Sequence, residues 1–286
     1  MTFILPSFGA SAISAVPGGG GGGASFPNSY ALEFDGIDDY VDTGSTFQST
    51  IRGGFTYSLW MKFESIDSGT YAPLGSWDDN ADQNSIYISD PSAGASLTYR
   101  LEVGIPKITL TAPPVGGWSA SDWYHVAVSV EQDSSNVVGK IYLNGVLGTT
   151  GTMTATLNNF ASSRSIYIGA RNRTNGSNIY FKGLIDEVAL FNTALSASQI
   201  TNIYRGEDDG GSGGTNGVPG DLSTFNSNNG PVGWWRMGDT GSDYGTATIT
   251  DQGSGGNDGT IVNGSSGNTS PTYHDLSTAP DSIYVA

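Results

Sequence analysis

Four aspartates fall within the eight-residue stretch DGIDDYVD, as Asp35, Asp38, Asp39 and Asp42. Carboxylate and backbone carbonyl oxygens are the ligands that Ca²⁺ prefers, and the ion takes six to eight of them. Aspartate side chains also close turns by accepting hydrogen bonds from nearby backbone amides, which is their more common role. The stretch therefore indicates either a calcium site or a series of Asp-stabilised turns.

A second stretch rich in Asp and Gly, DQGSGGNDGTIVNG, occupies residues 251–264. It is not an EF-hand loop, because the twelfth position from Asp251 is Val262 rather than the glutamate that such a loop requires. Glycine-Asp β-roll repeats need tandem copies, and the sequence has one. The pattern therefore favours a tight turn between two strands.

The composition excludes several classes of function. Lysine and arginine total 11 against 27 acidic residues, a formal charge of −16, so neither nucleic-acid binding nor attraction to an anionic membrane is expected. There is no cysteine, which excludes disulfides, thiol catalysis and Cys-based zinc sites. The two histidines are too few for a multi-His metal site, and no apolar run reaches the roughly 18 residues of a membrane span.

The segments that must position these residues are mostly short strands. FTYSLWMKF at 55–63 and WYHVAVSV at 123–130 alternate apolar and polar residues, as half-buried strands do. Asn144-Gly145 lies between two apolar runs and predicts a hairpin. Ser196 followed by Gln199 forms a capping box that begins one short helix, which ends at Gly206. The pattern predicts an all-β sandwich of antiparallel strands with one short helix.

Low-complexity segments divide the chain into four parts. Residues 1–29 are expected to form an extended N-terminal arm with a glycine-rich linker, rather than a secretory leader, because a positive start and a compact apolar core are missing. Residues 30–205 form the main β domain, and 206–230 a polar linker. Residues 231–286 form a C-terminal segment with two short apolar stretches, VGWWRM and GTIVNG.

Six blocks in this order resemble the LamG-like branch of the concanavalin A-like lectin/glucanase superfamily: ALEFDGIDDYVDTGS, FTYSLWMKF, DWYHVAVSV, KIYLNGVL, SIYIGARN and FKGLIDEVALFNTALSASQI. The resemblance covers residues 31–205 and implies a jelly-roll sandwich of two antiparallel sheets. In that family a segment like GWWRMGDTG…DQGSGGNDGTIVNG precedes the ALEFDG block, whereas here it follows at 233–264. We interpret this order as a circular permutation in which the C-terminal segment supplies the missing strands. A lost second repeat and pairing with a neighbouring subunit are the alternatives.

The resemblance also implies a structural Ca²⁺ ion at the edge of the sandwich. Its expected ligands are the carboxylates of Asp35 and Asp186 and the carbonyl oxygen of Gly36. In the alternative interpretation, Asp186 caps a turn or pairs with Arg171 or Lys182.

Sugar-binding sites of this fold lie on loops or on the concave sheet and combine aromatic rings with hydrogen-bonding groups. Two loops of this kind, SWDDNADQN and ARNRTNGSN, supply the predicted ligand-binding residues Trp77, Asp78, Asp79, Asn80, Arg171, Asn172 and Asn175. In the alternative interpretation, Trp77 closes the end of the core and the polar residues form ordinary turns.

The glucanase relatives carry a Glu-x-Asp-x-x-Glu pattern on one strand, which places nucleophile and acid on the same face. This sequence has no such pattern, because its six glutamates are isolated from one another. His125 is expected to be a packing residue. We therefore predict a protein that is not an enzyme.

The Ala/Pro-rich start, the glycine run, the LamG-like domain and the WWRMGD tail together resemble virion structural proteins of marine tailed phages. The resemblance implies a virion surface protein, as a capsid decoration or a tail or fibre component, that binds host or environmental glycans. Residues 1–23 would then contact other virion subunits or further copies of the chain. The alternatives are a purely structural assembly protein without a ligand and an adhesin module in an extracellular or cell-surface location.

Overall fold

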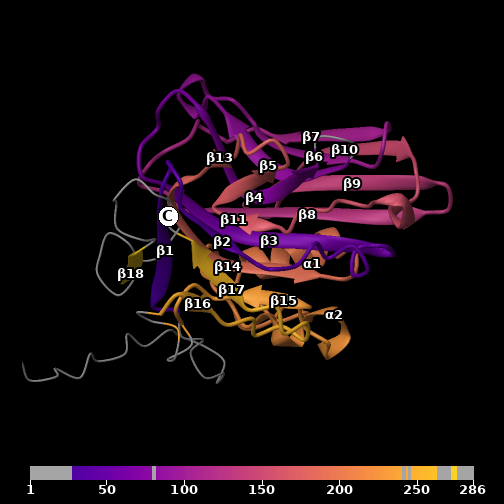
Figure 1. Cartoon of the computed structure of the whole chain (residues 1–286). Coiled ribbons are helices and arrows are strands. Elements are labelled where there is room, and N and C mark those ends of the chain that lie inside the picture. The colour runs from indigo at the N-terminus through magenta and orange to yellow at the C-terminus, as the bar shows by residue number, and fades with distance from the viewer. Residues whose placement is uncertain (1–27, 79–81, 240–242, 244–245, 263–271, 276–286) are drawn as a thin grey trace, which may run out of the picture.

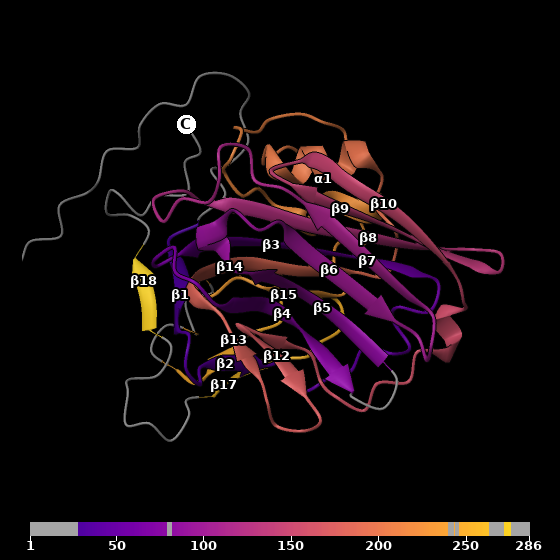
Figure 2. The same cartoon turned by 90° about the horizontal axis from the view of Figure 1, so that it is seen from above.

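The computed structural model describes residues 28–78, 82–239, 243, 246–262 and 272–275. The predicted assembly arm at 1–23 and the predicted site residues Asp79 and Asn80 lie outside these ranges. Two large β-sheets face each other and enclose the main core, which confirms the all-β sandwich (Figures 1 and 2). The strands pair in antiparallel fashion, except for one parallel pair in the second sheet.

The first sheet contains most of the long strands. Its order is β10 (Val146–Thr154), β9 (Asn136–Leu143), β8 (Tyr124–Asp133), β3 (Gly54–Phe63), β14 (Lys182–Phe191), β1 (Tyr30–Asp35) and β18 (Thr272–Asp275), and β15 (Gly233–Trp235) also pairs with β14.

The second sheet faces the inner side of the first. Its order is β16 (Thr248–Ile249), β17 (Gly259–Val262), β2 (Tyr40–Asp42), β11 (Tyr167–Ile168), β4 (Thr70–Asp78), β5 (Asp82–Ser89), β6 (Leu97–Glu102) and β7 (Lys107–Ala112). A hairpin of β12 (Ala170–Arg173) and β13 (Ile179–Tyr180) joins it, with β12 parallel to β4.

Helical elements are few and short. The helix α1 (Ala197–Tyr204) begins with the predicted capping box of Ser196 and Gln199. The others are α2 (Phe225–Asn228) and the 3₁₀ turns η1 (Pro91–Ala93), η2 (Leu157–Asn159) and η3 (Leu222–Thr224). No helix in the described part of the chain is long and apolar enough to cross a membrane.

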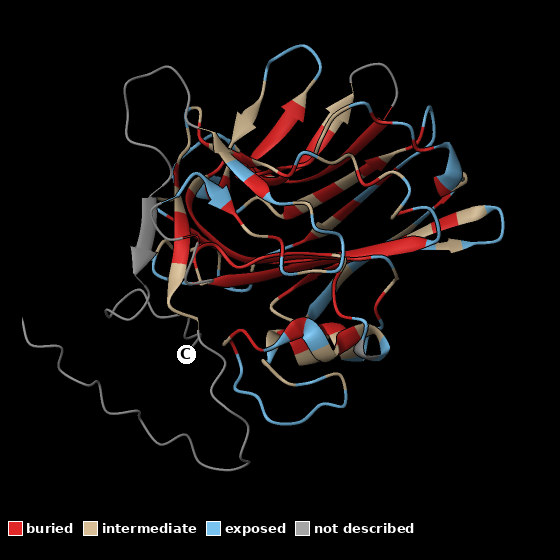
Figure 3. Cartoon of the chain, turned by 60° about the horizontal axis from the view of Figure 1, so that its bottom comes forward, coloured by how far each residue is buried: buried red, intermediate tan, exposed pale blue. Residues whose placement is uncertain are grey.

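Strand β3 is buried on both faces, and this organises the packing. Alternate residues from Phe55 to Phe63 enter the core between the sheets, as the sequence pattern predicts. The opposite face of the first sheet is covered by α1 and the chain around η3, so Ile203, Leu222 and Trp234 form a second apolar cluster there. Figure 3 shows α1 packed beside the buried strands.

At the far edge, the two sheets approach closely because β10 carries glycines. A Cβ atom on Gly148 would lie 2.5 Å from the carbonyl oxygen of Thr111, and one on Gly151 would lie 2.7 Å from Ile108. The amide of Thr111 on β7 also donates to Oγ1 of Thr149 at 2.8 Å. These contacts bring the edge strands β7 and β10 together.

Strands from the C-terminal segment pair with strands of the main domain in both sheets. In the first sheet β15 pairs with β14 and β18 with β1, and in the second β17 pairs with β2. The residues that precede them also contribute to the packing, since Leu222 and Phe225 are buried. The DQGSGGNDG stretch connects β16 to β17 through a loop in which the Asp251 carboxylate accepts hydrogen bonds from the amides of Trp234, Gly253 and Asn257.

Candidate functional site

The predicted sugar-binding loops meet at the end of β4. Register places Arg171 opposite Gly75 and Arg173 opposite Trp77 on the parallel pair of β12 and β4. The guanidinium carbon of Arg173 lies 4.0 Å from the centroid of the Trp77 ring, and that of Arg171 lies 4.7 Å from it. Both distances are within the range of cation–π contacts. The structure therefore brings Trp77 and Arg171, from the two predicted segments, together.

Asp78 ties this site to two further segments. Its Oδ2 accepts a hydrogen bond from the Ser163 hydroxyl at 2.8 Å, and its Oδ1 accepts one from the Thr174 hydroxyl at 3.2 Å. Trp77 and Asp78 are both partly exposed. The ends of β4 and β12 therefore carry the predicted residues on strands rather than on loops. Trp77, Asp78 and Arg173 are partly exposed there, whereas Arg171 is buried beside the Trp77 ring.

The two predicted asparagines have different surroundings. Asn172 is buried, accepts a hydrogen bond from Nε of Arg164 at 3.0 Å and donates one to the carbonyl of Ser165 at 3.1 Å. Asn175 is exposed, and its side chain accepts a hydrogen bond from the amide of Ser177 at 2.9 Å. Asn172 therefore connects β12 to the segment at Arg164 and Ser165, while Asn175 stabilises the turn between β12 and β13.

The structure does not bring the predicted metal ligands together. Asp35 lies opposite Lys182, whereas Asp186 is four residues further along β14. Consecutive strand residues are about 3.3 Å apart, so the two positions differ by about 13 Å along the sheet. Two separate acidic groups result, one of Asp35 with Asp38 and Asp39, and one of Asp186 with Glu187 and Asp239. Either group could hold a metal ion, and a single ion cannot bind both Asp35 and Asp186.

The group around Asp186 is buried beneath the C-terminal segment. A bulge between β14 and β3 interrupts the alternation after Asp186, and Glu187 has a φ of +48°. Oε1 of Glu187 accepts a hydrogen bond from Nε of Arg236 at 2.8 Å, and Oε2 accepts one from Nε1 of Trp234 at 2.6 Å. The WWRMGD stretch is therefore fastened to β14 by a buried polar network.

This network holds three carboxyl groups and one guanidinium group. The guanidinium of Arg236 is 3.7 Å from Asp239 and also binds Glu187, while Asp186 accepts the amide of Glu187 at 2.7 Å. Burial raises the pKa of Glu187 to about 7 and that of Asp239 to about 6. Burial, together with Glu187 and Asp239, raises the pKa of Asp186 well above its usual range. Sequence reasoning missed Glu187, Arg236 and Asp239; the only signal was that LIDEV and WWRMGD both carry charges within apolar stretches.

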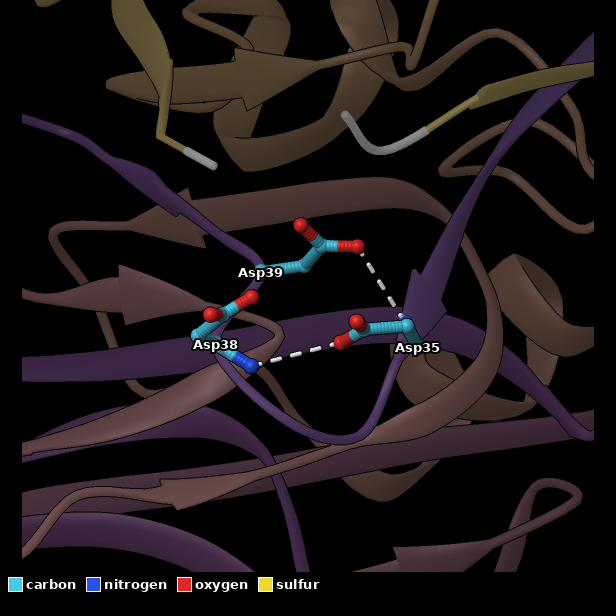
Figure 4. A group of neighbouring side chains, drawn as sticks. All are labelled: Asp35, Asp38 and Asp39. Carbon is cyan, nitrogen blue, oxygen red and sulfur yellow. Dashed lines mark hydrogen bonds between the residues drawn. The ribbon is translucent and has the colours of Figure 1, made fainter. Parts of the chain in front are cut away.

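The second acidic group lies in the turn between β1 and β2 (Figure 4). Oδ1 of Asp35 accepts hydrogen bonds from the amides of Ile37 at 2.7 Å and Asp38 at 3.3 Å. The amide of Asp35 donates to Oδ2 of Asp39 at 3.3 Å. Burial, and then the nearby charges of Asp35 and Asp38, raise the pKa of Asp39 to about 6. Gly36 forms the turn with a φ of +79°.

A serine and a histidine are paired on the outer face of the first sheet. Oγ of Ser58 lies 2.9 Å from Nε2 of His125, and both residues are buried. Burial lowers the pKa of His125 to about 3, and its ring packs 5.1 Å from that of Trp60. Nucleophilic catalysis by serine needs a histidine that a third group orients. Among the described residues Nδ1 of His125 has no hydrogen-bond partner, so this pair lacks the carboxylate of a triad.

Ser58 and Glu187 also line a small pocket of about 10 Å³, roughly the space of one water molecule, between the first sheet and the chain that covers it. Trp60, Ile203 and Leu222 supply apolar parts of its wall. The Glu187 carboxylate accepts hydrogen bonds from Trp234 and Arg236, and the Ser58 hydroxyl is hydrogen-bonded to His125. The polar groups of the cavity therefore serve the packing of the covering segment.

Comparison with solved structures shows similarity of fold. A candidate carbohydrate-binding protein from Bacteroides ovatus ATCC 8483 matches with a TM-score of 0.55 and 18% identity over 87% of this chain, which spans 60% of that protein's length. The CBM40 of the Ruminococcus gnavus IT-sialidase, bound to α2,3 sialyllactose, matches with a TM-score of 0.49 and 16% identity over 60% of this chain and 95% of that one. The heptameric SAP-like pentraxin of Limulus polyphemus matches with a TM-score of 0.39 and 17% identity. The match covers 64% of this chain and 78% of the pentraxin chain.

No curated protein sequence matches the chain significantly. The family model of the concanavalin A-like lectin/glucanases superfamily matches residues 35–201, which is more than half of the chain. The sandwich of two facing antiparallel sheets agrees with this match. The chain belongs to the concanavalin A-like lectin/glucanase superfamily.

Proposed function

We propose that this protein is a non-catalytic glycan-binding protein whose site lies at the adjoining ends of β4 and β12. The observation that carries the proposal is the partly exposed Trp77 ring with Arg171 and Arg173 against it and Asp78 beside it. Sugars are bound by aromatic surfaces together with a few placed hydrogen-bonding groups. The similarity to a candidate carbohydrate-binding protein supports the fold on which such a site would be built.

Trp77→Ala tests this proposal on the purified full chain. A glycan array first identifies a ligand, and calorimetry then measures its dissociation constant for the wild type and for the variants. We expect Trp77→Ala and Arg173→Ala to weaken binding by about tenfold or more, equivalent to about 1.4 kcal/mol. Arg100→Ala is the matched control, because Arg100 lies on β6 in the same sheet and pairs with Glu102 instead. Unchanged affinity in Trp77→Ala, with an unchanged melting temperature, would rule out this site.

The glycan-binding domain is proposed to be displayed on a virion surface, as a capsid decoration or a tail or fibre component. The resemblance of the Ala/Pro-rich start, the glycine run and the WWRMGD tail to virion structural proteins motivates this proposal. Residues 1–23 would contact neighbouring subunits. Labelling of source particles with an antibody against the chain, viewed by electron microscopy, tests it. Labelled cell envelopes and unlabelled particles would instead favour the adhesin alternative.

A structural Ca²⁺ ion is proposed at the buried group of Asp186 and Asp239. Oδ2 of Asp186 is buried and accepts no hydrogen bond, and Oδ2 of Asp239 lies 3.7 Å from the guanidinium of Arg236, which is one cation against three carboxyl groups. An ion there would neutralise the remaining charge and hold the C-terminal segment against β14. We expect added Ca²⁺ to raise the melting temperature of EDTA-treated protein, and Asp186→Asn to reduce that rise.

A further inference from the structure

We propose that Tyr87 is a second sugar-binding aromatic residue of the site at the ends of β4 and β12, and that the ligand is a glycan of two or more sugar rings. The inference rests on the proposed function and adds a contact residue and a ligand size to it. The guanidinium carbon of Arg171 lies 4.7 Å from the centroid of the Trp77 ring and 5.5 Å from that of the Tyr87 ring. Both distances are within the range of cation–π contacts. One guanidinium therefore joins the two aromatic rings.

The two rings lie on the same face of the second sheet. On β5, Ile86 and Ile88 enter the core between the sheets, so Tyr87 between them faces outward. On β4, Leu74 enters the core, and the same alternation directs Trp77 outward. Both aromatic residues are partly exposed. Since β4 and β5 pair directly, the rings stand on neighbouring strands (Figure 2).

The strand residues between the two rings are small. Gly75 on β4 pairs with Ser85 on β5, and each lies two residues from one of the aromatic residues. A Cβ atom on Gly75 would overlap the Ser85 side chain, so only glycine fits at this position. Arg171 pairs with Gly75 from β12 and is 6% exposed. The space above the small residues therefore accommodates the Arg171 guanidinium between Trp77 and Tyr87.

This arrangement gives Arg171 and the two rings different roles. The Arg171 guanidinium is buried against both rings, so it is a positioning residue that fixes them relative to each other. Trp77 and Tyr87 keep part of their surface exposed, and sugars bind to aromatic surfaces of this kind.

The spacing of the rings sets the size of the ligand. Because the Arg171 carbon is 4.7 Å from one centroid and 5.5 Å from the other, the two ring centroids are at most about 10 Å apart. Two rings this close on one face can each contact a different sugar ring of the same chain. The second contact is then intramolecular, so a longer glycan should bind more tightly than one of its sugar units.

Calorimetry on the purified full chain tests the inference. The probes are the array glycans that bind the wild type, each measured as the complete glycan and as its terminal monosaccharide. We expect Tyr87→Ala to weaken binding of the complete glycan by about fivefold, the loss of one aromatic contact, and to leave binding of the monosaccharide almost unchanged. Trp77→Ala should weaken binding of both probes.

Two matched variants serve as controls. Tyr87→Phe keeps the ring and should bind the complete glycan nearly as the wild type does. Tyr40→Ala removes another partly exposed tyrosine of the same sheet, whose ring stacks on Tyr167 at 4.0 Å, and should leave both affinities unchanged.

The role of Arg171 is tested by the ratio of the two affinities. Arg171→Met should weaken binding of the complete glycan more than binding of the monosaccharide, because the rings are no longer held together. Arg171→Lys restores a cation and should recover part of that ratio. A merely structural arginine would lower the melting temperature of both variants and leave the ratio unchanged.

The outcomes separate this inference from the proposed function. Wild-type affinity of Tyr87→Ala for the complete glycan, together with weak binding by Trp77→Ala, would overturn the second contact and leave the site at Trp77. Unchanged binding in both variants, or no array glycan bound by the wild type, would overturn both. Should Tyr87→Ala fail to fold, Tyr87→Leu decides in the same assay, because it keeps an apolar side chain but no aromatic ring.

Discussion

The ion pair of Arg236 and Glu187 is the contact whose loss should most weaken the attachment of the C-terminal segment. Nε of Arg236 lies 2.8 Å from Oε1 of Glu187, and the two side chains are 7% and 2% exposed. Arg236→Met removes the guanidinium and keeps an apolar stem, so Glu187, Asp186 and Asp239 are left without a buried cation. Removing one partner of a buried pair typically costs 3–5 kcal/mol. We therefore expect the free energy of unfolding to fall by about 3–5 kcal/mol.

Urea unfolding in EDTA at neutral pH, followed by tryptophan fluorescence, measures this loss. The double variant Arg236→Met/Glu187→Gln should recover part of it, because the unpaired carboxylate is then also removed. Arg100→Met is the control, since the Arg100–Glu102 pair is 26% and 17% exposed and should contribute only about 0–1 kcal/mol. A loss for Arg236→Met no larger than that of the control would refute the view that this network holds the segment.

Two further results follow from the packing and the buried charges. Gly169→Ala should lower the free energy of unfolding by about 2 kcal/mol or more. The reason is that Gly169 has a φ of +80° and that a Cβ atom there would lie 2.3 Å from the Phe34 ring. Calorimetry measures the change in stability, and an unchanged stability would contradict this packing argument. Ion-free protein should melt at a higher temperature at pH 5.5 than at pH 7.5. The pKa values of Asp39 and Glu187 are raised to about 6 and about 7, so the stability that their protonated forms contribute is lost as the pH rises through those values. His125 opposes this trend, because burial lowers its pKa from 6.5 to about 3 and the folded protein therefore loses stability as the pH falls below 6.5. The carboxyl groups with raised pKa values outnumber this one histidine. A melting temperature that is lower at pH 5.5 than at pH 7.5 would contradict this balance.

Local elements could be predicted because their signals are local. The capping box of Ser196 and Gln199 needs four consecutive residues, and the structure contains it. Asn144 and Gly145 both have positive φ, as the hairpin between β9 and β10 requires. The alternation from Phe55 to Phe63 correctly predicted which face of β3 enters the core between the sheets. Its second buried face was not predicted, since that depends on a segment more than 130 residues later in the chain.

The placement of the C-terminal segment combines both kinds of information. The order of blocks indicated that residues 233–264 belong with the main domain, and we still propose that the chain is circularly permuted relative to its family. The structure adds the pairing of β15 with β14 and of β17 with β2. A rearranged chain with residues 231–262 ahead of residue 30 should fold under this proposal. Failure of that chain to fold, while the natural order folds, would count against it.

The sequence by itself determined the residue types available for chemistry and the periods of the strands. It placed four aspartates in one short stretch and predicted Trp77 and Arg171 in two polar loops, whereas the structure places this pair in contact on strands β4 and β12. Only the tertiary structure decided which charges share a site. Asp35 and Asp186 were predicted to meet, but the register of β1 on β14 separates them and gives each its own acidic neighbours. Strand register depends on the packing of the whole sheet, so no local pattern of residues could have revealed it.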